Sequence, residues 1–203
     1  PELRPIREAA PHLVFKYLTD YLKTGLSRKE RASILARHYV VLGNRAHPRF
    51  FRTIVRDGVE LWGEAVADHA YNIVLKFPQE NHAEGDLQLV FRDGTFGLYS
   101  LAFTIGPGSV ASAGEGDVMY VTRIQGRGGA LDSIRKATKA CLDISPPALL
   151  LEAAEGIAME LDLACIIGIS AHSQLSFGLT PPTEFVAAYD AFWVTVGGEK
   201  HGA

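Results

Sequence analysis

Residues 118–130 are Val118-Met119-Tyr120-Val121-Thr122-Arg123-Ile124-Gln125-Gly126-Arg127-Gly128-Gly129-Ala130, an apolar run followed by a loop rich in glycine and arginine. The spacing of apolar residues in the next segment, 131–142, is typical of an amphipathic helix. A strand that leads through such a loop into a helix can bind phosphate, because the first helical N–H groups are unpaired and glycine lets the backbone approach an anion. The alternative interpretation is a tight strand-to-helix turn with a solvated arginine.

The loop is similar to the pyrophosphate loop of the acetyltransferase-like fold, and it fits that pattern in two registers, one from Arg123 and one from Gln125. The resemblance implies that the loop binds coenzyme A or another phosphate-bearing acyl donor. One feature departs from that fold, since two predicted helices, rather than one, separate the strand at 119–124 from the strand at 164–169. The cofactor-binding residues implied are Arg123, Gln125, Gly126, Arg127, Gly128, Gly129 and Ala130.

The segment before residue 59 is predicted to be helical. Apolar residues recur at helical spacing over 13–22, and Gly25 follows as a stop signal. Ser27-Arg28-Lys29-Glu30 is a capping box, in which Ser27 and Glu30 each bond the backbone of the other, and it opens a helix that runs to about Leu42. Residues 1–58 therefore form the helical N-terminal part.

After Val59 the apolar period changes to two, which predicts strands over 72–77, 87–91 and 96–105. Arg92-Asp93-Gly94-Thr95 supplies a hairpin turn, whereas 59–67 is ambiguous. Helices are predicted over 131–142, 147–161 and 182–194, and the apolar run 164–169 is expected to be a central strand. The fold class is α+β in a single domain, 1–203, with N-terminal helices, an antiparallel meander continuing into a mixed sheet in 59–203, and C-terminal helices.

Composition describes an ordinary globular protein, with 47% hydrophobic and 21% charged residues. A net charge of −3 is too mild to indicate a nucleic-acid partner. No uncharged apolar stretch is long enough to predict a membrane span. The start of the chain has no apolar leader-like region, so a cytoplasmic location is expected. Cys141 and Cys165 lie in apolar segments, and both are predicted to be reduced and buried.

The second half resembles the VirK/YbjX family of bacterial proteins. The resemblance rests on the segments 124–126, 148–153 and 166–170, and most distinctively on Tyr189-Asp190-Ala191-Phe192-Trp193 followed by Gly197-Gly198. The chain is identified as a divergent member, because Ser170-Ala171-His172-Ser173 stands where the family typically continues Ser-Asn. The resemblance implies a role in envelope remodelling, and a divergent member could also serve a biosynthetic pathway.

His172 is a candidate general base, because it follows a predicted strand and imidazole titrates near neutral pH. Ser170 and Tyr120 complete the candidate catalytic set. The alternative is that His172 is a loop residue bonded to backbone groups. Gly168-Ile169-Ser170-Ala171-His172 lacks the second glycine of a nucleophile elbow, which argues against a serine hydrolase.

Tyr189, Asp190 and Trp193 on the terminal helix are candidate substrate-binding residues. The alternative for Asp190 is a structural hydrogen bond. No metal site is predicted, because the histidines show no i, i+4 pair and no accompanying cysteine cluster. Four arginines and His47 make the stretch 45–56 basic, and a solvated helical face is the favoured interpretation.

Two functions remain open. The first is an acyl- or aminoacyl-transferase-like enzyme that acts on a small molecule or a peptide amine. The second is a non-catalytic protein that binds a peptide or a small molecule in an apolar groove or at a sheet edge. In either case the Gly126 loop and the segment 170–172 are expected at the same edge of the sheet, because their two strands are predicted to be parallel neighbours.

Overall fold

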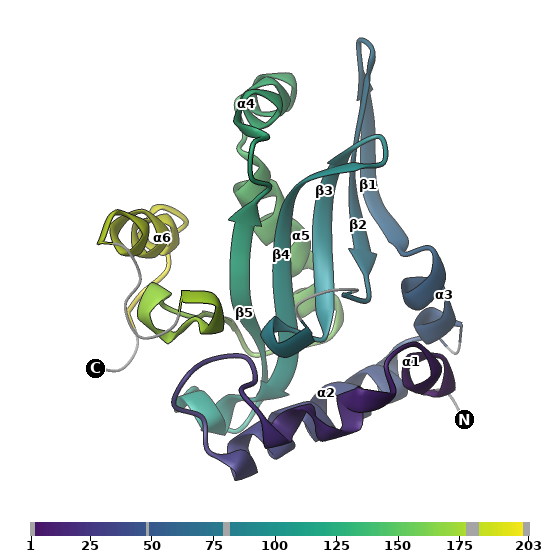
Figure 1. Cartoon of the computed structure of the whole chain (residues 1–203), viewed down its shortest axis with the longest axis vertical. Coiled ribbons are helices and arrows are strands. Elements are labelled where there is room, and N and C mark those ends of the chain that lie inside the picture. The colour runs from purple at the N-terminus through teal and green to yellow at the C-terminus, as the bar shows by residue number, and fades with distance from the viewer. Residues whose placement is uncertain (1–2, 48, 79–81, 178–182, 201–203) are drawn as a thin grey trace.

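The computed structural model describes residues 3–47, 49–78, 82–177 and 183–200. At its centre is a six-stranded sheet in which the strands lie side by side in chain order (Figure 1). The strands are β1 Val59–Val66, β2 His69–Lys76, β3 Leu87–Asp93, β4 Phe96–Pro107, β5 Asp117–Gly126 and β6 Ile166–Gly168. The pairs from β1 to β5 are antiparallel and the pair β5–β6 is parallel. The α+β class with a meander continuing into a mixed sheet is therefore confirmed.

Helices flank the sheet at both ends of the chain. The N-terminal ones are α1 Arg4–Ala9, the 3-10 helix η1 Pro11–Leu18, α2 Arg28–Arg45 and α3 Phe50–Arg56. The later ones are α4 Leu131–Ala140, α5 Pro146–Glu160 and α6 Thr183–Thr195, with short 3-10 turns η2 His82–Glu84, η3 Gly108–Ala111, η4 Ala171–Ser173 and η5 Leu175–Phe177. In Figure 1, α1 and α2 lie across the lower end of the sheet, α5 lies behind it, and α4 stands above the end of β5.

Several local signals are confirmed. The capping box of α2 is present, with the Glu30 amide donating to Ser27 and the Ser27 amide donating to the Glu30 carboxylate. The β3–β4 hairpin turns at Gly94, which has a φ of 57°. The ambiguous stretch after Val59 is strand β1. One local prediction differs from the structure: the helix expected over 13–22 is the 3-10 helix η1, which ends at Leu18, rather than an α-helix.

The core lies between the sheet and α5. Alternate residues of β3, Leu87, Leu89 and Phe91, are buried on the face toward the core, as the period of two predicts. From α5, the core contains Leu150, Leu151, Ala154 and Ala158, whose near-helical spacing places them on one side of the helix.

Two predictions are wrong. The run 164–169 was expected to be a central strand, but β6 covers only Ile166–Gly168, lies at the edge of the sheet and is partly exposed. Cys165 precedes this edge strand and is exposed, whereas Cys141 is buried as predicted, and both thiols are free. Both errors have the same physical reason. The position of a strand in the sheet, rather than its apolar composition, decides whether the strand and the residues beside it are buried, and β6 lies at the edge. Of the predicted terminal helix 182–194, Pro182 lies outside the described residues.

Candidate functional site

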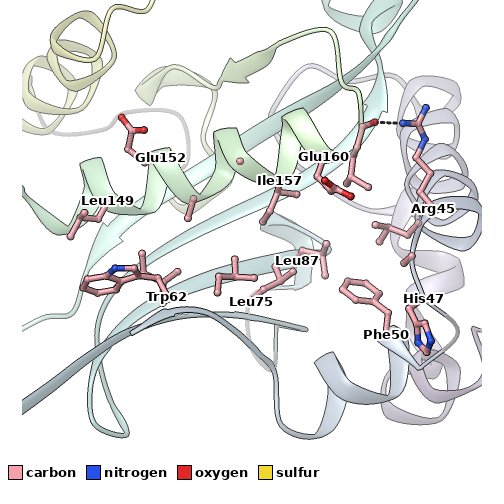
Figure 2. A pocket seen from close by; sticks show the side chains of 17 residues that line it. Arg45, His47, Phe50, Trp62, Leu75, Leu87, Leu149, Glu152, Ile157 and Glu160 are labelled. Carbon is pink, nitrogen blue, oxygen red and sulfur yellow. Dashed lines mark hydrogen bonds between the residues drawn. The ribbon is translucent and has the colours of Figure 1, made fainter. Parts of the chain in front are cut away.

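An apolar pocket lies between α5 and the strands β1, β2 and β3, with a volume of about 630 Å³ (Figure 2). We call it the α5 pocket. Its floor consists of Ile73, Leu75 and Leu87, which are buried, and Leu42 adds to it from α2. Pockets of about 300–1,000 Å³ with mainly apolar walls are typical of small-molecule sites. The α5 pocket has the size and the lining of such a site.

The pocket exists because α5 carries a second apolar stripe that the sheet does not fill. Leu149, Ala153 and Ile157 line the pocket at helical spacing, beside the stripe that enters the core. Gly156 lies on the same side, and a Cβ atom built there would have no neighbour within 4 Å. A glycine inside a helix costs about 0.5–1 kcal/mol relative to alanine, and no close contact requires one at this position. The small residue leaves the space open.

The opposite wall comes from β1, where the register shifts between Glu60 and Trp62. This irregularity leaves Leu61 without a partner on β2, and both Leu61 and Trp62 line the pocket. The Trp62 ring stacks at 6.4 Å on Phe91 of β3, which fixes its position. The edge strand therefore gives the pocket an aromatic and an aliphatic wall.

The two ends of the α5 pocket differ in charge. Figure 2 shows Trp62 and Leu149 at one end and Arg45, His47 and Phe50 at the other. The guanidinium of Arg45 donates to the Leu161 carbonyl at 2.7 Å and so ties the end of α2 to the end of α5. Two exposed glutamates, Glu152 and Glu160, lie on the α5 side of the rim.

The Gly-rich loop does connect a strand to a helix, as the sequence predicts. Gly126 is the last residue of β5 and packs against the Tyr99 ring, since a Cβ atom there would come within 2.8 Å of it. The Arg127 amide donates to the Leu98 carbonyl at 2.9 Å, and its guanidinium lies 4.3 Å from the centre of the Phe96 ring. Gly128, Gly129 and Ala130 complete the turn into α4, with a φ of 75° at Gly129.

The side chains of Arg123 and Gln125 are hydrogen-bonded to each other. The Arg123 Nε donates to the Gln125 side-chain oxygen at 2.7 Å, and an NH1 group donates to Glu84 at 3.0 Å. Burial raises the pKa of Glu84, and the Arg123 guanidinium opposes that shift. The arginine charge is thus matched by a carboxylate within the protein.

The candidate catalytic residues occupy different surroundings. Tyr120 is buried, its hydroxyl donates to the Pro107 carbonyl at 2.6 Å, and burial raises its pKa to about 12. His172 and Ser170 are exposed, and the Ser170 hydroxyl donates to that of Ser173 at 3.3 Å. No hydrogen bond joins any two of the three within the part of the chain that the structure describes.

β5, which leads into the Gly126 loop, and β6, which leads into the segment 170–172, are parallel neighbours, but they pair over only a short distance. β6 pairs with Met119–Val121 near the start of β5, whereas Gly126 lies at the far end of β5 opposite Tyr99. The segment 170–172 continues from β6 as η4, beside the first half of β5. The Gly126 loop is further along the strand.

The candidate substrate-binding residues make contacts inside the protein. The Asp190 carboxylate accepts a hydrogen bond from the Ala171 amide at 2.9 Å. Trp193 packs over Gly168, where a Cβ atom would lie 2.5 Å from the indole. Tyr189 is buried, and burial raises the pKa of its hydroxyl. Gln174, the Ile124 backbone and Trp193 approach that hydroxyl, but none reaches hydrogen-bond geometry among the described residues.

A buried polar cluster around Asp86 was not predicted from the sequence. Lys16 donates to Asp86 at 2.8 Å, and the Tyr39 hydroxyl donates to the same oxygen at 3.2 Å. The other carboxylate oxygen accepts from Thr104 at 2.8 Å and from the Tyr21 hydroxyl. Burial alone would raise the pKa of Asp86, but Lys16 and the hydrogen bonds lower it to about 2. The cluster ties η1 and α2 to the sheet.

His38 lies beside this cluster and is fully buried. Its Nδ1 accepts the Ile105 amide at 3.0 Å, and burial lowers its pKa to about 4. The ring is therefore neutral at physiological pH. Since Tyr21, Asp86 and Thr104 are also buried, the cluster offers no surface to a ligand.

Within the described ranges, no group of three or more His, Cys, Asp or Glu side chains is placed to hold a metal ion. No helix in those same ranges is long and apolar enough to cross a membrane.

The fold and the pocket together define an α+β protein with a mixed sheet and an apolar site beside α5. The chain belongs to the family described as "Protein of unknown function (DUF535)", which matches residues 1–203. It is similar to the Escherichia coli (strain K12) "Uncharacterized protein YbjX", with 27% identity over 213 residues. That alignment covers 99% of this chain and 63% of the relative. The resemblance to the VirK/YbjX family is confirmed, and no solved structure matches.

Proposed function

We propose that this protein binds a small, elongated apolar molecule in the α5 pocket. The observation that carries the proposal is a cavity of about 630 Å³ whose floor and walls are almost entirely aliphatic and aromatic. Each methylene group that leaves water for such a site contributes about 0.8 kcal/mol. A ligand with an aliphatic chain would therefore gain free energy along the whole pocket.

The shape of the pocket favours a single chain. Its α5 wall runs from Leu149 to Leu161, which at 1.5 Å per residue spans about 18 Å of helix. The cavity is therefore elongated along α5. The occupant we propose is one extended aliphatic chain rather than a peptide or a broad ring system.

A pocket-filling variant tests this function. Gly156→Leu places a side chain at the pocket where a Cβ atom has no close neighbour, and it removes a glycine from the interior of α5. We expect at least a tenfold loss of affinity for a fluorescent alkyl probe that dodecanol displaces. The free energy of unfolding should be unchanged or about 0.5–1 kcal/mol higher.

Glu155→Leu is the matched control, because it adds the same side chain at the adjacent, exposed position of α5 that does not line the pocket. This variant should bind the probe like the wild type. Equal affinity in all three proteins, or no displaceable binding to the wild type, would contradict the proposal.

Acyl or aminoacyl transfer is the second candidate function. One observation favours it. β4 pairs along β5 as far as Gly126, but on the other side β6 pairs only with Met119–Val121, so among the described residues the second half of β5 has no strand on that side. β5 then leads directly through the Gly-rich loop into α4. In this proposal coenzyme A or a similar donor binds at 126–130, and His172 removes a proton from the acceptor amine. Calorimetry with coenzyme A should give saturable heat that Arg127→Ala reduces; no heat would rule out this donor.

A further inference from the structure

The cationic side chains that line the α5 pocket lie at one of its ends, and this position determines where a polar group of the ligand would bind. The α2–α3 connection forms one end of the pocket, and the stretch 45–56 contains four arginines, one histidine and no Asp or Glu. Arg45 and His47 line the pocket at this end beside Phe50 (Figure 2). At the other end, Trp62 and Leu149 are apolar.

The cations of this stretch are incompletely neutralised. Arg45 lies 3.9 Å from Asp162 and Arg56 lies 2.7 Å from Asp57. Arg49 and Arg52 form no ion pair with any described residue, and both are exposed. A guanidinium presents several donors in a plane and suits a carboxylate or a phosphate. An anionic group at this end would be both attracted and hydrogen-bonded.

Acidic residues on the rim limit where that anion can lie. Glu152 and Glu160 are both on α5, and Figure 2 shows Glu152 near Leu149 and Glu160 near Arg45. Glu152 repels a negative group at the Trp62 end, whereas at the other end Arg45 and His47 lie together with Glu160. The anion is therefore directed toward Arg45 and His47, while the chain extends along Ile157 and Leu75 toward Trp62.

We infer that the ligand of the α5 pocket is a single-chain aliphatic carboxylate, bound with its carboxylate at Arg45 and His47 and its chain end at Trp62. This inference rests on the proposed function and adds the chemical class and the direction of the ligand. The length of the α5 wall, about 18 Å, matches an extended chain of roughly a dozen carbons.

A set of ligands with one chain and different head groups tests the inference. Dodecanoate, dodecanol and dodecyltrimethylammonium are titrated into the full chain by calorimetry, below the concentrations at which they form micelles. Dodecanoate should bind at least tenfold more tightly than the ammonium compound, with dodecanol between them. Shorter carboxylates should lose about fourfold in affinity for each methylene removed.

Variants of the basic end provide the second measurement. Arg45→Met keeps an apolar stem and removes the charge, so it should weaken dodecanoate three- to tenfold and leave dodecanol within twofold. Arg45→Lys should retain most of the preference for dodecanoate, which separates the loss of charge from the loss of the bond to Leu161. Arg56→Met is the matched control, since Arg56 belongs to the same basic stretch and does not line the pocket.

The outcomes separate the two proposals. Equal binding of the three head groups, tighter binding of the ammonium compound, or the same effect from Arg45→Met and Arg56→Met would overturn the inference and leave the α5 pocket an apolar site. Binding of none of the three compounds would overturn both the inference and the proposed function.

Discussion

Asp86 is held as a carboxylate inside the protein by Lys16 and three hydroxyl groups. Lys16 and Asp86 are 70 residues apart in the chain, and neither lies in a motif. Their pairing depends on how η1 packs beside the segment that precedes β3, which no local pattern of residues encodes. The sequence therefore predicted neither the cluster nor the burial of Lys16. By contrast, the Ser27–Glu30 capping box is local and was predicted correctly.

Asp86→Asn tests the role of this cluster. The change preserves the shape of the side chain but leaves the Lys16 ammonium buried without its carboxylate, so the free energy of unfolding should fall by about 3–5 kcal/mol. Asp57→Asn is the control, since Asp57 pairs with Arg56 and the two side chains are 55% and 76% exposed, and exposed pairs contribute about 0–1 kcal/mol. Urea denaturation measures both, and equal losses would show that the Asp86 cluster has no special role in stability.

Among the elements, those specified by local sequence were predicted best. The β3–β4 hairpin and α4 follow directly from turn residues and apolar spacing. The prediction for β6 is wrong, because its apolar residues look like those of a central strand although, among the described residues, only β5 pairs with it. α6 covers part of one face of β6, through Trp193 over Gly168. Trp193 is a candidate substrate-binding residue by sequence, and in the structure it packs against Gly168.

Gly168→Ala tests how α6 is attached. The added methyl group would lie 2.5 Å from the Trp193 indole, a rigid ring that cannot bend away. We expect a loss of about 1–3 kcal/mol in stability from overpacking and a red shift of Trp193 emission, measured in a Trp62→Phe background. Gly128→Ala, where a Cβ atom has no neighbour within 4 Å, should change neither. An unshifted spectrum in Gly168→Ala would refute this packing.

For the whole molecule, the change of apolar period near Val59 was enough to predict helices followed by a meander and a mixed sheet. The α5 pocket was not predictable in the same way. It forms where α5 crosses strands far from it in the chain, and the space depends on a residue without a side chain, Gly156. The interior glycine of a predicted helix was the one signal available. The basic character of the stretch 45–56 is evident from the sequence, but its place at the end of the pocket depends on the fold.

The most direct test uses the two tryptophans as reporters. Trp62 lines the α5 pocket, whereas Trp193 lies on α6 against Gly168. In a ¹H–¹⁵N spectrum, each gives one indole N–H signal. Titration with dodecanoate should shift the Trp62 signal in a saturable manner and leave that of Trp193 in place, and Gly156→Leu should abolish the shift. A Trp62 signal that does not move at saturating dodecanoate would contradict the account of the pocket.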